Sequence, residues 1–141
     1  MPSAFQFFEL TATVRKGCAA LAVLMYAAIL VLGSIPGARA EVGELASGLI
    51  LHMLAYGAIT LLLFIGIGLG RTHGAGRVLL AVALMGALDE LLQSYLPYRS
   101  GALGDWAIDI GAAVLVLAGM MVWPRLRRRT NRPRASAARH R

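Results

Sequence analysis

Residues 49–69 form the run LILHMLAYGAITLLLFIGIGL, which contains no Asp, Glu, Lys or Arg. The hydrocarbon core of a bilayer is about 30 Å thick, and about 20 helical residues cross it. Helix is the form that suits such a run in lipid, because every backbone N–H and C=O must find a partner within the segment. This stretch therefore predicts a transmembrane helix and places the chain among integral membrane proteins.

Three further apolar stretches are long enough to cross a bilayer. They cover residues 17–35, 78–96 and 103–123. Pro36, Pro97 and Pro124 lie at the expected exits of three of the four helices, because proline does not continue a helix easily. The whole chain of 141 residues is 58% hydrophobic, well above the roughly 45–50% of a soluble domain. We expect one all-α domain, an integral membrane four-helix bundle over residues 17–124.

The positions of lysine and arginine predict the orientation of this bundle. Twelve of the fourteen basic residues precede the first helix, lie between the second and third, or follow the fourth. The other two loops contain one each, Arg39 and Arg99. Cytoplasmic segments carry the excess of Lys and Arg, so both termini are expected in the cytoplasm. Residues 1–16 are then a cytoplasmic N-terminal segment.

Eight arginines follow Pro124, so the net charge of +7 is largely a property of the tail. Residues 125–141 have too little apolar content to fold and are expected to form a basic, disordered cytoplasmic tail. Nucleic-acid binding is disfavoured, because no aromatic residues alternate with these arginines and no recognised module is present. The arginines closest to the membrane are predicted to contact anionic lipid headgroups. They are Arg125, Arg127, Arg128 and Arg129.

The first apolar stretch has two interpretations. Arg15 and Lys16 precede it, and Ala38-Arg39-Ala40 follow it like the small-x-small cleavage site of a signal peptide. Its apolar core of about 19 residues exceeds the roughly 7–15 of a signal peptide, which favours a retained helix. Cleavage would leave three helices in the same orientation. Cys18 lies within this stretch and has no second cysteine to pair with, so we expect it to serve packing.

Polar side chains gather near the extracytoplasmic end of the predicted bundle. Glu90 and Asp109 each lie six residues from the outer end of their helix, or ~9 Å at 1.5 Å per residue. His52 and Tyr56 lie one turn apart and share a face. Ionisable groups in membrane helices are costly, so they mark function or helix pairing. We expect them to share a water-accessible pocket formed by His52, Tyr56, Asp89, Glu90, Gln93, Arg99, Asp105 and Asp109.

Each of these groups also has a purely structural interpretation. His52 bonded to Tyr56 or to a carboxylate would lock the bundle together. Asp105 would cap the start of its helix, because acidic residues favour helix N-termini, whereas Asp109 is too deep for that role. Asp89 and Glu90 would pair with Arg99 in the following loop.

Three motifs together resemble the VanZ-like family of small membrane proteins. They are His52-Met-Leu-Ala-Tyr56-Gly57, Asp89-Glu90-Leu-Leu-Gln93-Ser-Tyr-Leu-Pro97-Tyr-Arg99 and Asp105-Trp-Ala-Ile-Asp109-Ile-Gly111. Gly33-Ser34-Ile35-Pro36-Gly37 is also similar to the family's exit from its first helix, and the resemblance covers residues 33–119. It implies a multi-pass protein of the bacterial cytoplasmic membrane, in a family whose founding member is associated with resistance to the glycopeptide teicoplanin.

The chain departs from the family pattern at two places. Asp109 stands where the family usually has Asn, which adds a negative charge. Gly48 and Leu49 stand where many members have Asp-Lys before the histidine, which removes an ion pair. Ligand chemistry transferred from the family is weaker for both reasons.

Three classes of function remain open. The first is non-enzymatic binding of an envelope lipid, a lipid-linked cell-wall precursor or an amphiphilic antibiotic, with Arg99 contacting the headgroup. The second is a membrane-embedded hydrolase or transferase acting on a lipid-linked substrate, with His52 as general base. A divalent metal would then have as candidate ligands His52, Glu90, Asp105 and Asp109.

No His-Glu-x-x-His or serine-elbow motif supports the enzymatic class. Proton-coupled transport, the third class, is disfavoured because no ionisable residue in the inner halves of the helices continues a path. We therefore expect a binding protein with no cofactor. The sequence leaves the oligomeric state open.

Overall fold

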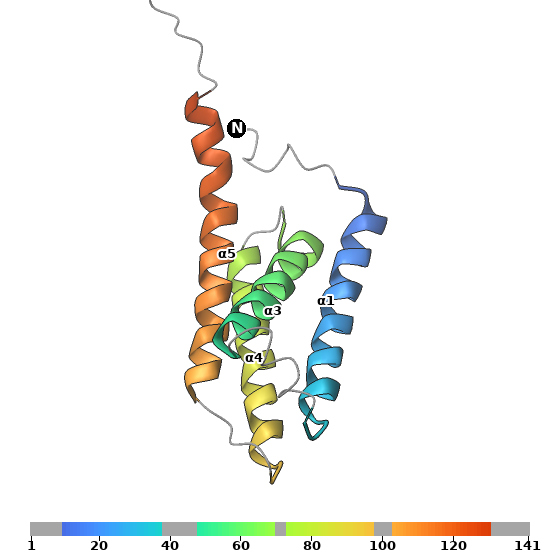
Figure 1. Cartoon of the computed structure of the whole chain (residues 1–141). Coiled ribbons are helices and arrows are strands. Elements are labelled where there is room, and N and C mark those ends of the chain that lie inside the picture. Colours follow the sequence, from blue (N-terminus) through green and yellow to red (C-terminus); the bar gives the residue numbers. More distant parts are fainter. Residues whose placement is uncertain (1–9, 38–47, 70–72, 98–102, 131–141) are drawn as a thin grey trace, which may run out of the picture.

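The computed structural model describes residues 10–37, 48–69, 73–97 and 103–130, the last seven of these by their backbone alone. Four helices make up the described chain: α1 (Ala12–Gly33), α3 (Gly48–Leu63) with its π-helical continuation η1 (Phe64–Gly68), α4 (Gly74–Ser94) and α5 (Leu103–Thr130). Successive helices run in opposite directions (Figure 1). One end of the bundle, as Figure 1 shows, therefore contains the last turns of α1 and α4 and the first turns of α3 and α5. The all-α prediction is confirmed for these residues.

Three of the helical segments are long and apolar enough to cross a membrane: Ala12–Gly33, Gly48–Gly68 and Leu103–Trp123. The fourth predicted span, residues 78–96, corresponds to α4 but does not meet this description. The reason is that α4 carries Arg77, Asp89 and Glu90 in 21 residues.

Three polar residues of α4, Asp89, Glu90 and Gln93, lie on its inner face. Its buried positions repeat at helical spacing and include Val82, Gly86, Asp89 and Gln93. Its outer face is a stripe of exposed leucines at Leu80, Leu84, Leu88 and Leu91. Because residues three and four apart share a helix face, α4 separates a polar, protein-facing side from an apolar outer side.

Helices α3, α4 and α5 form the core, and α1 packs against their side. The buried apolar side chains come mostly from α3 with η1, α4 and α5, and they include Tyr56, Ile59, Phe64, Val82 and Leu117. Ala22 is the buried residue of α1. Tyr26 adds a polar link, since its hydroxyl donates to Met85 O at 2.9 Å. Helix α1 is thus attached by one buried small residue, by partly buried side chains such as Met25 and Ile29, and by hydrogen bonds.

Arg15 holds the start of α1 to the end of η1. Its Nε donates to Gly66 O at 3.3 Å and its Nη2 to Leu69 O at 3.0 Å. These carbonyls lie at the C-terminal end of the helix, which carries a partial negative charge. A Cβ at Gly66 would lie 2.9 Å from Ala19 Cβ. The missing side chain at residue 66 therefore allows the close approach of the two helices.

Helix α1 begins earlier than expected. It starts at Ala12, whereas residues 1–16 were predicted to be a segment outside the helix. The physical reason is an N-cap: the Thr11 Oγ1 accepts a hydrogen bond from Val14 N at 3.3 Å, which satisfies a backbone donor of the first turn. The helix therefore begins five residues before the predicted start at residue 17, and residues 1–9 lie outside the described chain.

Helix α5 ends later than expected. It continues through Pro124 to Thr130, so the predicted helix exit at Pro124 and the disorder predicted from residue 125 are wrong over these residues. Proline keeps φ near −65°, which a helix accommodates at the loss of one backbone hydrogen bond. The predicted disorder of residues 131–141 lies outside the described chain.

Candidate functional site

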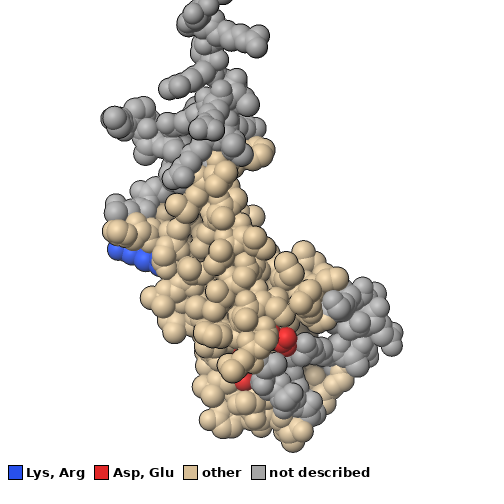
Figure 2. Space-filling view, turned by 90° about the vertical axis from the view of Figure 1, so that its left-hand side faces the viewer, with Lys and Arg blue, Asp and Glu red and all other residues tan. Residues whose placement is uncertain are grey.

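All acidic residues that the structure describes lie at one end of the bundle. They come from the end of α4 (Asp89 and Glu90) and the start of α5 (Asp105 and Asp109). The described lysine and arginine side chains, on Arg15, Lys16 and Arg77, belong to the first turns of α1 and α4 at the other end. Figure 2 shows this separation on one face, where blue and red atoms lie apart on a surface whose other described residues are tan. The described part of the molecule thus has one acidic and one basic end.

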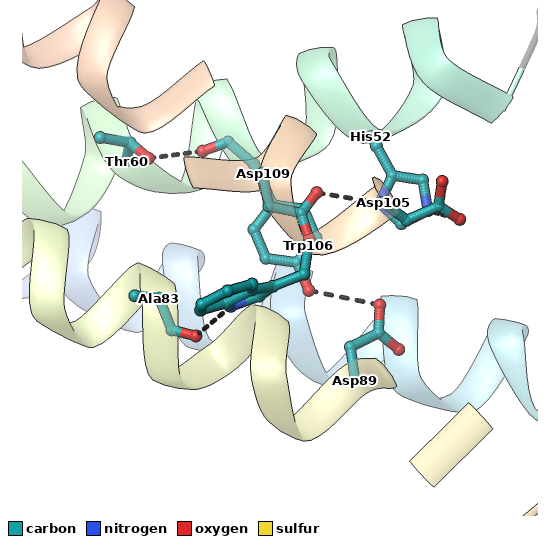
Figure 3. Close-up of polar contacts among 8 residues, drawn as sticks. His52, Thr60, Ala83, Asp89, Asp105, Trp106 and Asp109 are labelled. Carbon is teal, nitrogen blue, oxygen red and sulfur yellow. Dashed lines mark hydrogen bonds and ion pairs between the residues drawn. The ribbon is translucent and has the colours of Figure 1, made fainter. Parts of the chain in front are cut away.

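His52 lies between two carboxylates of α5. Its Nδ1 is 2.9 Å from Asp109 Oδ1, and its Nε2 is 3.8 Å from Asp105 Oδ2 (Figure 3). The Asp109 side chain is fully buried, whereas the Asp105 side chain is 27% exposed. With Asp109 in its ionised form, which can only accept hydrogen bonds, His52 donates from Nδ1 to Asp109. The imidazole therefore connects a buried carboxylate with one near the surface.

Tyr56 links α3 to α4 one turn deeper. Its hydroxyl donates to Asp89 Oδ2 at 3.3 Å. Its ring stacks on the His52 imidazole, with centroids 6.0 Å apart and planes 3° from parallel. The Asp89 side chain is buried, and a buried carboxylate needs such donors because desolvation of a charged group is costly. Tyr56 thus contacts Asp89 of α4 directly and also the imidazole that lies beside Asp109 of α5.

The other residues predicted for the site and for lipid contact are only partly described by the structure. Glu90 and Gln93 are buried on the same face of α4 as Asp89. Arg99 lies outside the described residues. The side chains of Arg125, Arg127, Arg128 and Arg129 also lie outside the description, although the backbone of α5 extends past them. We call the set His52, Tyr56, Asp89, Glu90, Gln93, Asp105 and Asp109 the polar cluster.

Most side chains of the polar cluster are enclosed by the described helices. His52, at the start of α3, exposes 11% of its side chain, and Asp89 and Asp109 are almost fully enclosed. Asp109 Oδ2 has no hydrogen-bond partner among the described residues. Access to the polar cluster from outside is therefore greatest at Asp105.

No group of three or more His, Cys, Asp or Glu side chains within the described residues has the arrangement of a metal site. The candidate ligands from the sequence were His52, Glu90, Asp105 and Asp109. Of these, His52 already has a carboxylate within hydrogen-bond distance of its Nδ1. The contacts of the polar cluster are thus those of an ion-pair and hydrogen-bond network.

The structure adds residues to the site that the sequence motifs did not single out. Trp106 Nε1 donates to Ala83 O at 2.9 Å, and Gly86 lies against Asp109. A signal for both was present in their spacing: Gly86 precedes Asp89, and Trp106 precedes Asp109, by three residues, which places each on the same helix face. Thr60 bonds the Tyr56 carbonyl at 2.6 Å and belongs to the same buried layer.

Comparison of the chain with protein-family models, with curated proteins and with solved structures finds no match. The resemblance to the VanZ-like family therefore stays a prediction from the three sequence motifs.

Proposed function

We propose that this chain is a VanZ-like multi-pass membrane protein that binds the polar headgroup of an amphiphile at the polar cluster. The observation that carries the proposal is the convergence of ionisable side chains from three helices at one end of an apolar bundle. Such groups are costly in a membrane and face protein or polar ligands. The described surface between the acidic and the basic end is rich in exposed apolar residues, which favours the acidic end, where the polar cluster lies, as the place where a polar group is recognised.

The proposed membrane arrangement has α4 crossing together with its neighbours. Its acidic residues are buried within the bundle and its leucines face outward, so lipid would contact an apolar surface along most of the helix, and the exposed Arg77 lies in its first turn. The basic end, with Arg15, Lys16 and Arg77, would face the cytoplasm. The polar cluster would then lie in the extracytoplasmic leaflet of a bacterial cytoplasmic membrane.

This orientation can be measured with single cysteines. In a Cys18→Ala background, we expect Ser34→Cys and Ser94→Cys to react with a membrane-impermeant maleimide in intact cells, because both lie at the acidic end. Lys16→Cys and Arg77→Cys should react after the membrane is opened. The reverse labelling pattern would contradict the proposed orientation.

The ligand class that we propose is an envelope lipid, a lipid-linked cell-wall precursor or an amphiphilic antibiotic of the glycopeptide type. Such molecules present a polar headgroup at the extracytoplasmic surface and an apolar tail to the leaflet. Arg99, in the loop between α4 and α5, would contribute a positive charge to headgroup binding. A contribution to glycopeptide resistance or to envelope homeostasis would follow.

Native mass spectrometry with a defined ligand panel tests the proposal. The panel contains phosphatidylethanolamine, phosphatidylglycerol, cardiolipin, a polyprenyl-diphosphate cell-wall precursor and teicoplanin. The wild type should retain at least one of these through delipidation, and His52→Ala and Arg99→Ala should lose it while remaining folded. Lys16→Ala, at the opposite end, is the matched control and should bind like the wild type. The proposal fails if the wild type retains no panel member.

One observation favours a second candidate, a membrane-embedded hydrolase or transferase acting on a lipid-linked substrate. Asp109 orients the His52 imidazole through Nδ1, and this leaves Nε2 on the side of the partly exposed Asp105. A carboxylate that fixes a histidine in this way is a recurrent arrangement for a general base. The test is whether the wild type converts the polyprenyl-diphosphate cell-wall precursor to a product. A conversion that depends on added divalent metal would support this candidate over binding alone.

A further inference from the structure

Helix α5 packs tightly against α4 at Gly86. A Cβ at this residue would lie 3.0 Å from Asp109 Oδ2 and 3.1 Å from Trp106 Cδ1. Both distances are shorter than ordinary van der Waals contact. Because residue 86 has no side chain, a carboxylate and an indole from α5 can lie directly against the backbone of α4.

Trp106 fixes the rotation of α5 at this level. Its indole N–H donates to Ala83 O at 2.9 Å, as Figure 3 shows. Ala83 lies three residues before Gly86, so the indole covers the α4 surface on which Asp109 rests. The indole is partly buried, and an indole N–H in such a position usually has a hydrogen-bond partner. This hydrogen bond selects one orientation of the ring and thereby of the helix that carries it.

Asp109 is confined on two sides as a result. Its Oδ1 faces His52 Nδ1 at 2.9 Å, and its Oδ2 is buried beside Gly86 without a hydrogen-bond partner among the described residues. The second oxygen contributes no hydrogen bond there, so its position is set by packing. A shift of α5 away from α4 would therefore move the first oxygen relative to the imidazole.

We infer that Gly86 and Trp106 are positioning residues of the proposed binding site, which hold Asp109 so that it orients the imidazole of His52. Neither residue needs to touch the ligand. The part of this inference that concerns binding rests on the proposed function, whereas the part that concerns the His52–Asp109 hydrogen bond does not.

Gly86→Ala and Gly76→Ala form a matched pair for the test. Both introduce one methyl group into α4, but the Cβ at Gly76 would meet nothing within 4 Å. The first readout is the Nδ1–H resonance of His52 in ring-¹⁵N-histidine protein in nanodiscs, assigned by its loss in His52→Gln. The second readout is affinity for the five-member ligand panel by native mass spectrometry.

We expect Gly86→Ala to lose solvent protection of the His52 Nδ1–H and to bind the retained panel member at least about tenfold more weakly, as overpacking of a tight contact displaces its neighbours. Gly76→Ala should match the wild type in both readouts. Wild-type protection and affinity in Gly86→Ala would overturn the inference. Loss of protection in Gly86→Ala, in a protein whose wild type binds no panel member, would support the positioning role and overturn the proposed function.

Trp106→Phe decides the question if Gly86→Ala does not fold. This substitution keeps an aromatic ring and removes the N–H that reaches Ala83 O. Reduced protection of the His52 Nδ1–H supports the positioning role. An unchanged Nδ1–H resonance with unchanged affinity overturns it for Trp106.

Discussion

His52 Nδ1 and Asp109 Oδ1 lie 2.9 Å apart across the contact between α3 and α5, and the Asp109 side chain has no exposed surface. This pair joins the start of one apolar helix to the first turns of another. It is also the pair on which both the binding and the catalytic proposals depend, because it fixes which imidazole nitrogen faces the surface.

Replacing Asp109 by alanine should destabilise the protein and disorder the imidazole. A hydrogen bond to a charged group is worth about 1.5–3 kcal/mol, and we expect a loss of that order in thermal unfolding in detergent. Asp109→Asn keeps an acceptor oxygen of the same shape and should lose clearly less stability. Equal losses in the two variants would show that the hydrogen bond to His52 is not what matters at this position.

Removal of the Tyr56 hydroxyl should remove the hydrogen bond that it donates to Asp89 Oδ2. Because Asp89 is buried, we expect Tyr56→Phe to cost about 1–3 kcal/mol in the free energy of unfolding. Tyr95→Phe is the matched control, since Tyr95 is 77% exposed, and it should change stability little. Comparable effects of the two substitutions would argue against the Tyr56–Asp89 hydrogen bond.

Arg15→Lys should loosen α1 although it keeps the positive charge. The guanidinium reaches two carbonyls, Gly66 O and Leu69 O, and an ammonium cannot reproduce this fork. We expect a lower unfolding temperature and faster proteolysis between α1 and α3. Lys16→Arg changes an exposed neighbouring residue and should leave both measurements unchanged. If Lys16→Arg lowered the unfolding temperature as much as Arg15→Lys, the two Arg15 hydrogen bonds would not be the cause of the loss.

Gly66→Ala tests the same contact from the other helix. Its Cβ would lie 2.9 Å from Ala19 Cβ and 3.0 Å from Arg15 O, so α1 must move outward. Overpacking of this kind costs about 1–3 kcal/mol. Gly17→Ala, where a Cβ meets nothing within 4 Å, should be neutral or slightly stabilising because alanine favours helix. Thermal unfolding of the two variants side by side gives the answer.

The sequence by itself determined the helical character of the chain and the separation of its charges. Runs such as residues 49–69 are too long and too apolar for another structure in lipid. The spacing of His52 and Tyr56, and of Asp105 and Asp109, also placed each pair on one helix face. These inferences succeed because they depend on local periodicity and on the count of charged residues along the chain.

The ends of α1 and α5 were harder to predict for a local reason. Thr11 caps α1 within the stretch that was assigned to the segment before the helix, and Pro124 is accommodated within α5. Both residue types are compatible with either a helix interior or its boundary. The hydrophobic pattern alone therefore does not decide between the two.

Only the tertiary structure decided which polar groups are partners. It pairs His52 with Asp109 and Tyr56 with Asp89, brings Trp106 to Ala83, and uses Gly86 and Gly66 for close helix contacts. The physical reason is that an apolar helix in lipid has little amphipathicity to show which face is buried. The rotation and crossing of the helices follow from side-chain packing between them, and that packing places Asp109 against His52.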